Sequence, residues 1–126
     1  MLRKEIRKMN IDFLTSSGHK IGLEKFLELY KEGKAILLDV RTKDEVEIFS
    51  INLGINIPLH ELPDNLDKIP KNKLVATFCN EKVRSSIAYA YLLSEGFDNV
   101  KVLAATIKEV VEKLKPGFVK KLKGNE

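Results

Sequence analysis

The sequence is poor in the residues that build disulfides and metal sites: its 126 residues include one cysteine, Cys79, and two histidines, His19 and His60. A single cysteine excludes a disulfide within the chain, and the spacing of these three residues matches no zinc-binding pattern. We therefore expect a protein without a metal or a cofactor, located in the cytoplasm.

Long apolar segments are also missing. No stretch approaches the roughly 20 consecutive apolar residues that a membrane-spanning helix needs. Residues 6–14 follow a basic start, but charged and polar side chains interrupt them, so they lack the apolar centre of a secretory signal peptide. These absences predict a protein without a membrane partner.

The net charge of +4 is small for a chain with 22 basic and 18 acidic residues. The two signs alternate along most of the sequence, which is typical of a solvated surface. Basic residues are densest at the two ends of the chain, but no stacking aromatic residues are interleaved with them, as a nucleic-acid surface would require. We therefore expect no nucleic-acid partner.

The length fits one domain, because 126 residues with 44% hydrophobic content can bury one core. Residues 1–18 show no clear period and end in the breaker Ser16-Ser17-Gly18, so we expect an N-terminal extension that packs loosely or pairs with a partner. Residues 19–126 form the predicted domain. Beyond Pro116 we expect an exposed basic end, although Phe118, Val119 and Leu122 could form a short docking helix.

Apolar residues within the predicted domain alternate between helical spacings and short continuous runs typical of buried strands. The expected helices cover residues 23–30, 62–69, 85–95 and 107–114, and a further short helix begins at a capping box in residues 42–45. The expected strands cover residues 35–38, 55–57, 74–78 and 100–103. In the helix after residue 85, the spacing places Ile87, Ala88, Tyr91 and Leu92 on the buried face. This alternation predicts an α/β fold, with a mainly parallel sheet of about five strands and helices on both faces.

Two predicted strands end in residues that can do chemistry. Asp39-Val40-Arg41 follows the strand at 35–38, and Cys79 follows the strand at 74–78. Ligands of parallel sheets bind beyond the carboxyl ends of the strands. A cysteine between such a strand and a helix N-terminus meets inward-pointing N–H groups and the positive end of the helix dipole, which favour its thiolate. The same position also suits a small buried hydrophobic residue, as most free cysteines are.

Several motifs resemble the rhodanese family, in the family's order. They are Leu37-Leu38-Asp39-Val40-Arg41, Asp44-Glu45, Ile55-Asn56-Ile57-Pro58-Leu59, Leu62-Pro63, the cysteine loop ending in Arg84-Ser85-Ser86, and Leu92-Leu93-Ser94-Glu95-Gly96-Phe97. The resemblance implies a rhodanese-like three-layer sandwich and a sulfurtransferase. Cys79 would accept sulfane sulfur from a small donor, hold it as a persulfide and pass it to a thiol or protein acceptor.

The resemblance also assigns roles to the neighbours of the cysteine. The substrate-binding loop would consist of Asn80, Glu81, Lys82, Val83 and Arg84. From Cys79 to Arg84 there are six residues, as in sulfur-handling members, whereas related phosphatases and arsenate reductases have one residue more, so phosphate hydrolysis is disfavoured. Asp39 and Arg41 would line or support the crevice. Arg41 would pair with a carboxylate such as Glu45, or belong to a purely structural salt bridge.

The chain departs from the family pattern at several positions. Lys82 stands where many members have glycine, and a non-glycine residue at positive φ costs about 1–2 kcal/mol, so the loop is expected to differ in shape or to be held less tightly. Glu81 places a negative charge beside the cysteine, which opposes both the thiolate and a dianionic donor such as thiosulfate. The usual histidine is absent from residues 49–54, and Ala105-Thr106 replaces a late Gly-Gly pair.

These departures favour a persulfide carrier with an undetermined donor over an efficient thiosulfate-to-cyanide enzyme. Because the chain has no second cysteine to resolve the persulfide, the acceptor must be another molecule. Two alternatives stay open. One is a catalytically weak or inactive rhodanese-like module that binds a protein or senses redox state. The other, less favoured, is a phosphatase or arsenate reductase.

Overall fold

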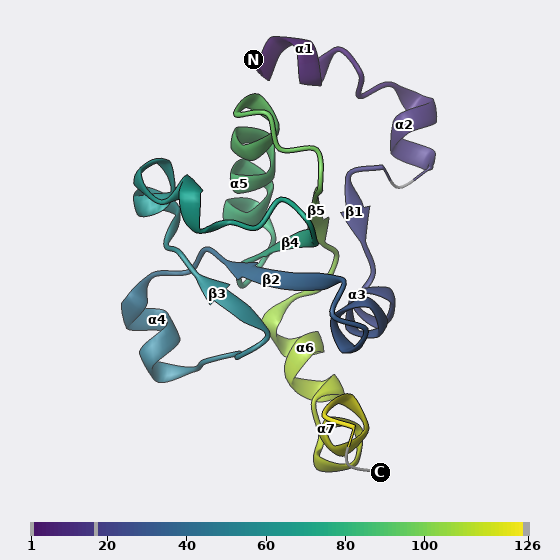
Figure 1. The fold of residues 1–126 in the computed structure, drawn as a ribbon, viewed down its shortest axis with the longest axis vertical. Coiled ribbons are helices and arrows are strands. Elements are labelled where there is room, and N and C mark those ends of the chain that lie inside the picture. Colours follow the sequence, from purple (N-terminus) through teal and green to yellow (C-terminus); the bar gives the residue numbers. More distant parts are fainter. Residues whose placement is uncertain (1, 17, 125–126) are drawn as a thin grey trace.

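The computed structural model describes residues 2–16 and 18–124, and a five-stranded sheet lies at its centre (Figure 1). The strands are β1 (Lys20–Ile21), β2 (Ala35–Asp39), β3 (Gly54–Asn56), β4 (Leu74–Phe78) and β5 (Val100–Leu103). Their order in the sheet is β1-β5-β4-β2-β3, and every neighbouring pair is parallel. The carboxyl ends of all five strands therefore lie at one edge. The predicted α/β class with a parallel sheet is confirmed.

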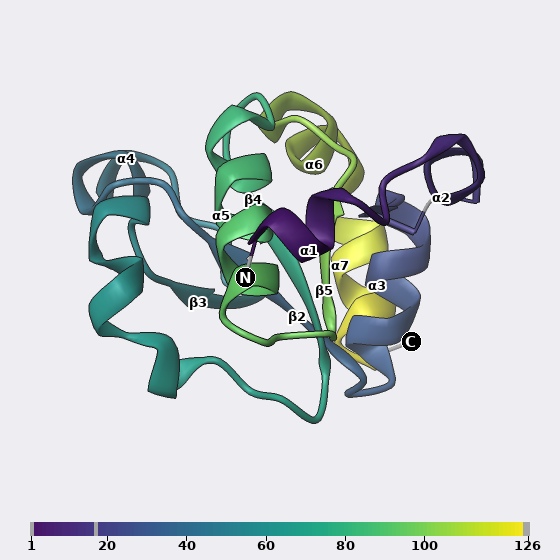
Figure 2. The same cartoon turned by 90° about the horizontal axis from the view of Figure 1, so that it is seen from above.

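Helices cover both faces of this sheet. They are α3 (Leu23–Lys31), α4 (Lys43–Ile48), α5 (Val83–Ser94), α6 (Ile107–Lys113), α7 (Pro116–Leu122) and the 3-10 helices η1 (Leu59–Asp64) and η2 (Leu66–Lys68). Residues of α5 and η1 build the core on one face, whereas residues of α3, α6 and α7 build the core on the other. Figure 2 shows α5 on one side of β5, and α3 and α7 on the other.

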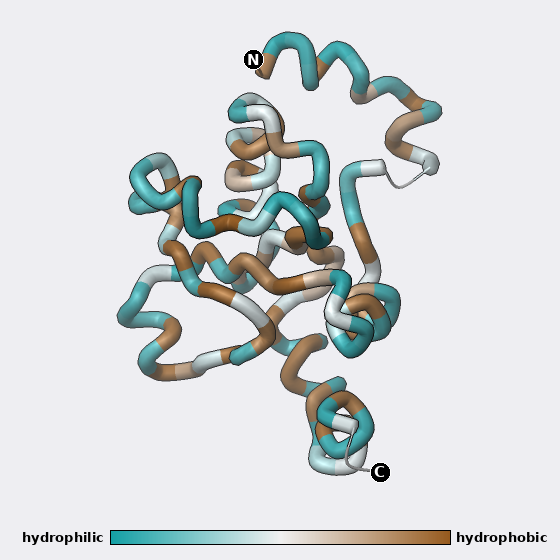
Figure 3. Tube along the Cα trace, viewed as in Figure 1, coloured by the Kyte–Doolittle hydropathy of each residue, from teal (hydrophilic) through white to brown (hydrophobic). Residues whose placement is uncertain are grey.

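The two central strands β2 and β4 are buried on both faces. Leu38 and Val75 belong to the core under α5, while Leu37 and Ala76 belong to the core under α3 and α6. None of these four side chains is more than 1% exposed. Continuous apolar runs of this kind are typical of parallel strands covered on both sides. Figure 3 shows the hydrophobic residues along β2, at the middle of the molecule.

The N-terminal segment forms two helices, α1 (Leu2–Ile6) and α2 (Ile11–Thr15), although its sequence shows no clear period. Helix α1 contacts α5, and Met9 packs against the core on that face of the sheet. Ser17, in the predicted breaker, lies outside the described residues. The edge strand β1 follows and was not predicted, because two residues carry no periodic signal.

Two local predictions in the second half of the chain are wrong. The helix expected over residues 62–69 is divided into η1 and η2, because Pro63 lacks the N–H of an α-helix and Asn65 leaves helical geometry at φ −133°. The exposed C-terminal end is instead helix α7, whose Leu122 is 8% exposed and belongs to the core. The alternative of a short docking helix was the correct one.

The buried face of α5 also differs from the predicted one. Ala88 and Leu92 are fully buried as expected, but Ile87 is 52% exposed and Tyr91 is only partly buried. Tyr89 takes the buried position instead, at 6% exposed. The helix is therefore rotated about its axis relative to the face that the apolar residues suggest.

Gly54 marks a close approach between β3 and β2. A Cβ atom at this position would overlap the main-chain oxygen and nitrogen of Leu37. We expect Gly54→Ala to lower the free energy of unfolding by about 1–3 kcal/mol, because the two strands must separate. Gly117→Ala in α7 is the matched control, since no atom beyond its chain neighbours and the backbone of its own helix lies within 4 Å of its Cβ position. Chemical denaturation measures both variants, and wild-type stability of Gly54→Ala would contradict this expectation.

Candidate active site

Cys79 follows the last residue of β4, and the loop that it begins leads directly into α5. The helix starts at Val83, two residues before the predicted start, so the end of the loop forms the first turn of α5. Both ends of the loop are anchored by hydrogen bonds. The N–H of Val40 donates to the carbonyl of Phe78 at 2.9 Å, and Oγ1 of Thr77 donates to the carbonyl of Ser85 at 2.9 Å. These hydrogen bonds fix the chain on both sides of the Cys79 sulfur.

The sulfur atom of Cys79 is surrounded by hydrogen-bond donors. The N–H of Ser85 donates to Sγ at 3.3 Å, and Oγ of Ser85 lies 3.6 Å from Sγ. The N–H groups of Glu81 and Lys82 also interact with it. Burial raises the pKa of the Cys79 thiol, but the hydrogen bonds from Ser85 and these two amides outweigh burial, so the pKa lies below its ordinary value. The loop therefore favours the thiolate, although Cys79 is only 2% exposed.

Lys82 gives the loop its curvature. Its backbone has φ 76° and ψ −4°, the left-handed conformation, and no other non-glycine residue in 2–16 or 18–124 has a positive φ. Lys82 therefore adopts the conformation that glycine favours, at a cost of about 1–2 kcal/mol. A left-handed residue beside right-handed ones turns successive N–H groups toward one side, where they form an anion-binding concavity. This geometry accounts for the amides directed at the sulfur.

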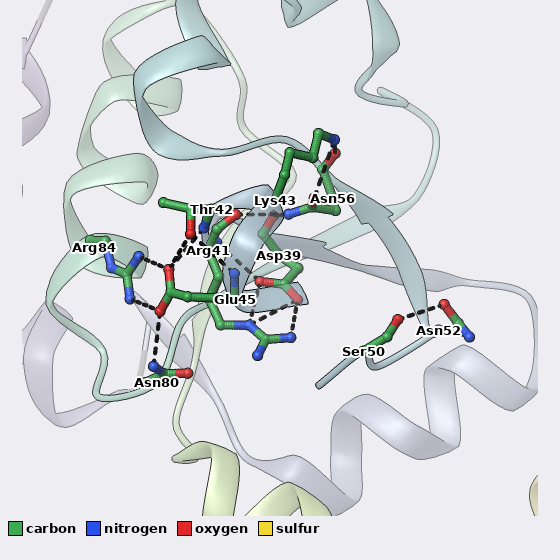
Figure 4. A network of polar contacts seen from close by, with 10 residues as sticks. All are labelled: Asp39, Arg41, Thr42, Lys43, Glu45, Ser50, Asn52, Asn56, Asn80 and Arg84. Atoms are coloured by element: carbon green, nitrogen blue, oxygen red, sulfur yellow. Dashed lines mark hydrogen bonds and ion pairs between the residues drawn. The ribbon is translucent and has the colours of Figure 1, made fainter. Parts of the chain in front are cut away.

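Glu45, on α4, connects that helix to the cysteine loop (Figure 4). Its Oε1 accepts hydrogen bonds from the N–H of Thr42 at 2.9 Å and from Nη1 of Arg84 at 2.6 Å. Its Oε2 accepts from Nη2 of Arg84 at 2.8 Å and from Nδ2 of Asn80 at 3.1 Å. The Arg84 hydrogen bonds, followed by that from Thr42, hold the pKa of the Glu45 carboxyl far below its usual range. The predicted capping box at Thr42 is present, and its carboxylate also fixes the loop.

Asp39 and Arg41 form a second ion pair, which is buried. Nη2 of Arg41 donates to Oδ2 of Asp39 at 2.7 Å, and Nε donates to Oδ1 at 3.0 Å. The guanidinium also lies over the Phe78 ring, 5.5 Å from its centroid. The predicted pairing of Arg41 with Glu45 is wrong, because Asp39 satisfies Arg41 while Arg84 occupies Glu45. The alternative prediction, a structural salt bridge of Arg41, is the correct one. At 3% and 1% exposed, Asp39 and Arg41 are buried at the carboxyl end of β2 rather than lying on an open surface.

The structure brings together only part of the predicted loop. Asn80 and Arg84 are partly buried and meet at Glu45, whereas Glu81, Lys82 and Val83 have exposed side chains. In residues 2–16 and 18–124, no group of three or more His, Cys, Asp or Glu side chains is arranged to hold a metal ion. No helix within the same described segments has the length and apolarity that crossing a membrane requires.

Ser85 and Glu45 are site residues that sequence reasoning missed. Ser85 stands in the motif that resembles the rhodanese family, but its contribution is mainly a main-chain N–H, whose direction residue types do not encode. Glu45 carried a capping signal for α4, and only the fold shows that the same carboxylate reaches Arg84. A conformation-dependent contact of this kind leaves no periodic or spacing signal in the chain.

A sequence profile described as a rhodanese-like domain matches residues 23–113. The chain belongs to the rhodanese-like domain family. The resemblance inferred from its ordered motifs is thereby confirmed. The match includes the cysteine loop and leaves the N-terminal helices α1 and α2 outside the rhodanese-like region.

Curated relatives of this rhodanese-like domain include sulfurtransferases. A sulfurtransferase from Allochromatium vinosum is 34% identical over 65 residues, which are 52% of this chain and 61% of the relative. A tRNA sulfurtransferase from Photorhabdus laumondii is 37% identical over 71 residues, which cover 53% of this chain and 15% of the relative. The matched region thus spans less than two thirds of either relative. These similarities support a sulfurtransferase-type role for the family to which the chain belongs.

Solved structures share the same rhodanese-like fold. A human single-domain sulfurtransferase superposes with a TM-score of 0.62 at 26% identity, and the match covers 76% of this chain and 97% of that one. An NAD-dependent persulfide reductase from A. fulgidus superposes with a TM-score of 0.56 at 29% identity, over 71% of this chain and 15% of that one. The fold therefore occurs both as a single domain and as part of a longer chain.

The Ser85→Ala variant tests the side-chain hydrogen bond between Ser85 and the sulfur, since alanine keeps the main-chain N–H. It should raise the pKa of Cys79, because one donor to the thiolate is lost while the burial that opposes ionisation remains. Thiolate absorbance during a pH titration measures the midpoint, with Cys79→Ser as the blank because Cys79 is the only cysteine. Ser94→Ala, at the other end of α5, is the control and should leave the midpoint unchanged. A wild-type midpoint at or above that of the denatured protein would contradict a stabilised thiolate.

The Lys82→Gly variant tests the strain in the loop. It should raise the free energy of unfolding by on the order of 1 kcal/mol, because glycine adopts φ 76° without a steric penalty. Lys82→Ala removes the same charge but retains a Cβ atom, so it should show no such gain. Urea denaturation of the two variants separates strain from charge, and equal stability of both would indicate that strain at this residue is negligible.

Proposed function

We propose that this domain is a persulfide carrier, which accepts sulfane sulfur on Cys79 and passes it to a thiol. The observation that carries the proposal is the hydrogen bond from the N–H of Ser85 to Sγ of Cys79 at 3.3 Å, joined by the amides of Glu81 and Lys82. Main-chain donors directed at one atom favour the anionic form of that atom without a metal. They would stabilise the thiolate of Cys79 before sulfur transfer and its persulfide afterwards.

Loading and unloading are both thiol exchange reactions. In loading, the thiolate of Cys79 attacks the outer sulfur of a donor R–S–SH, and a bond forms between Sγ and that sulfur. The sulfur–sulfur bond of the donor breaks, and R–S⁻ leaves with the electron pair. In unloading, an acceptor thiolate attacks the outer sulfur of Cys79–S–SH, and Cys79 leaves as a thiolate. No electrons pass to the protein overall.

The acceptor in this proposal is a separate molecule, since the chain contains one cysteine. The similarity to proteins named as sulfurtransferases supports sulfur transfer as the reaction type. The similarity to a protein named as a persulfide reductase supports a persulfide as the form in which sulfur is handled. Donor and acceptor would both meet the loop at the carboxyl edge of the sheet.

A second candidate function is a non-catalytic module that binds a protein or responds to redox state. The 2% exposure of Cys79 favours it, because a donor must reach a sulfur that lies below the surface. The hydrogen bonds to the sulfur favour the persulfide carrier, since a cysteine that only fills space in the core does not need amides directed at it. The two candidates differ in whether the sulfur reacts.

Incubation with glutathione persulfide should add the mass of one sulfur atom to the wild-type protein. Cys79→Ser should gain nothing, because it lacks the nucleophile, and an added thiol should remove the extra sulfur from the wild type. Intact-protein mass spectrometry at neutral pH follows each step. If the wild type stays unmodified by glutathione persulfide, polysulfide and thiosulfate alike, the carrier function fails and the non-catalytic candidate stands.

A further inference from the structure

The ion pair between Arg84 and Glu45 sets the charge that a sulfur donor meets at the loop. Both terminal nitrogens of Arg84 donate to the two carboxylate oxygens, at 2.6 and 2.8 Å, in a bidentate arrangement. Thr42 and Asn80 donate to the same carboxylate, so the pair is held from α4 and from the loop. The positive charge of Arg84 is therefore matched by a carboxylate before any donor arrives.

Arg84 also interacts electrostatically with Cys79, which begins the same loop. Its pKa is raised, first by its hydrogen bonds to Glu45 and to a smaller extent by the charge of Cys79. Without Glu45, the guanidinium would be a positive charge available to an anion at the mouth of the loop. The side chain of Glu45 thus decides whether this charge is available.

The other charged residues of the loop do not replace the positive charge of Arg84. Lys82 is exposed, and it acts on Glu109 of α6, whose pKa is lowered chiefly by hydrogen bonds from Thr106 and further by Lys82. Glu81, beside it, carries the opposite charge. The formal charges of Glu45, Glu81, Lys82 and Arg84 sum to zero, so these four residues carry no net positive charge.

We propose that Glu45 determines the donor class of this site: by holding Arg84, it makes the loop suited to organic persulfides and unsuited to thiosulfate. The inference rests on the proposed function of Cys79. An organic persulfide brings at most one negative charge to the reacting end, which the main-chain amides around the sulfur stabilise. Thiosulfate brings two, and both stay with the sulfite that leaves.

The two loading reactions show where the additional charge appears. With a persulfide, Cys–S⁻ and R–S–SH give Cys–S–SH and R–S⁻, so one negative charge moves from Cys79 to the leaving thiolate. With thiosulfate, Cys–S⁻ and S–SO₃²⁻ give Cys–S–S⁻ and SO₃²⁻, so three negative charges meet in the transition state. A nearby unmatched cation would stabilise the second reaction more than the first.

The Glu45→Gln variant tests this inference. Glutamine has the same length and also serves in a capping box, so α4 keeps its N-terminal hydrogen bonds while the charge of Arg84 becomes unmatched. The measured quantity is the rate constant for sulfur loading of Cys79 by thiosulfate divided by that for glutathione persulfide, from the rate of mass gain. We expect this ratio to rise about tenfold, which corresponds to about 1.4 kcal/mol.

Glu47→Gln is the matched control, because Glu47 lies on the same helix with an exposed side chain. It removes one negative charge without touching Arg84 and should keep the ratio within about twofold of the wild-type value. Adding Arg84→Gln to Glu45→Gln should abolish the gain, because the released cation is then absent. A gain that persists in the double variant would overturn the inference.

The outcomes distinguish this inference from the proposed function. A folded Glu45→Gln protein with the wild-type ratio would overturn the inference alone, whereas a wild type that no donor loads would overturn the function of Cys79. If Glu45→Gln does not fold, Glu45→Asp takes its place, because its shorter side chain keeps the charge but cannot maintain the bidentate contact. Its ratio should rise by less than that of Glu45→Gln, and the absence of any rise would count against the inference.

Discussion

Main-chain N–H groups directed at the sulfur of Cys79 are the interaction on which the geometry of this site depends. The sulfur is almost completely buried, and burial alone would raise the pKa of the thiol. Hydrogen bonds from Ser85 and two loop amides reverse that effect. These N–H groups converge only if the chain turns sharply between β4 and α5, and the turn requires Lys82 at φ 76°. Stabilisation of the sulfur and strain in the backbone therefore have one origin.

A strained backbone persists only where its surroundings determine its conformation. Here the surroundings act on both ends of the loop. Asn80 and Arg84 are hydrogen-bonded to Glu45 of α4, and Thr77 of β4 is hydrogen-bonded to the carbonyl of Ser85. Helix α4 is thus a structural support of the cysteine loop, although the hydrogen bonds to the sulfur come from Ser85, Glu81 and Lys82 and not from α4. The bidentate contact with Arg84 is the strongest of these attachments, since charged, two-point hydrogen bonds are stronger than neutral ones.

The sequence predicted the features that depend on residue type at a given position. The apolar runs at 35–38 and 74–78 predicted the central strands, and the position of Cys79 between a strand and a helix indicated the candidate nucleophile. Features that depend on local backbone direction were not predictable. Arg41 pairs with Asp39 two residues away because of the turn after β2, and the buried face of α5 depends on how the helix is rotated on the sheet. The role of the Ser85 N–H belongs to this second group.

Both arginines at the carboxyl edge of β2 and β4 are matched by a carboxylate: Arg41 by Asp39 in the interior, and Arg84 by Glu45 at the mouth of the loop. The negative charge of a Cys79 thiolate is consequently stabilised mainly by main-chain dipoles. A main-chain N–H group interacts strongly only at hydrogen-bond distance and with one acceptor atom. An unmatched guanidinium would instead attract any anion in its vicinity. An arrangement of this kind stabilises a single charge on sulfur while giving little attraction to a bulky dianion. The selectivity of the site therefore follows from how its cations are paired as much as from how many it has.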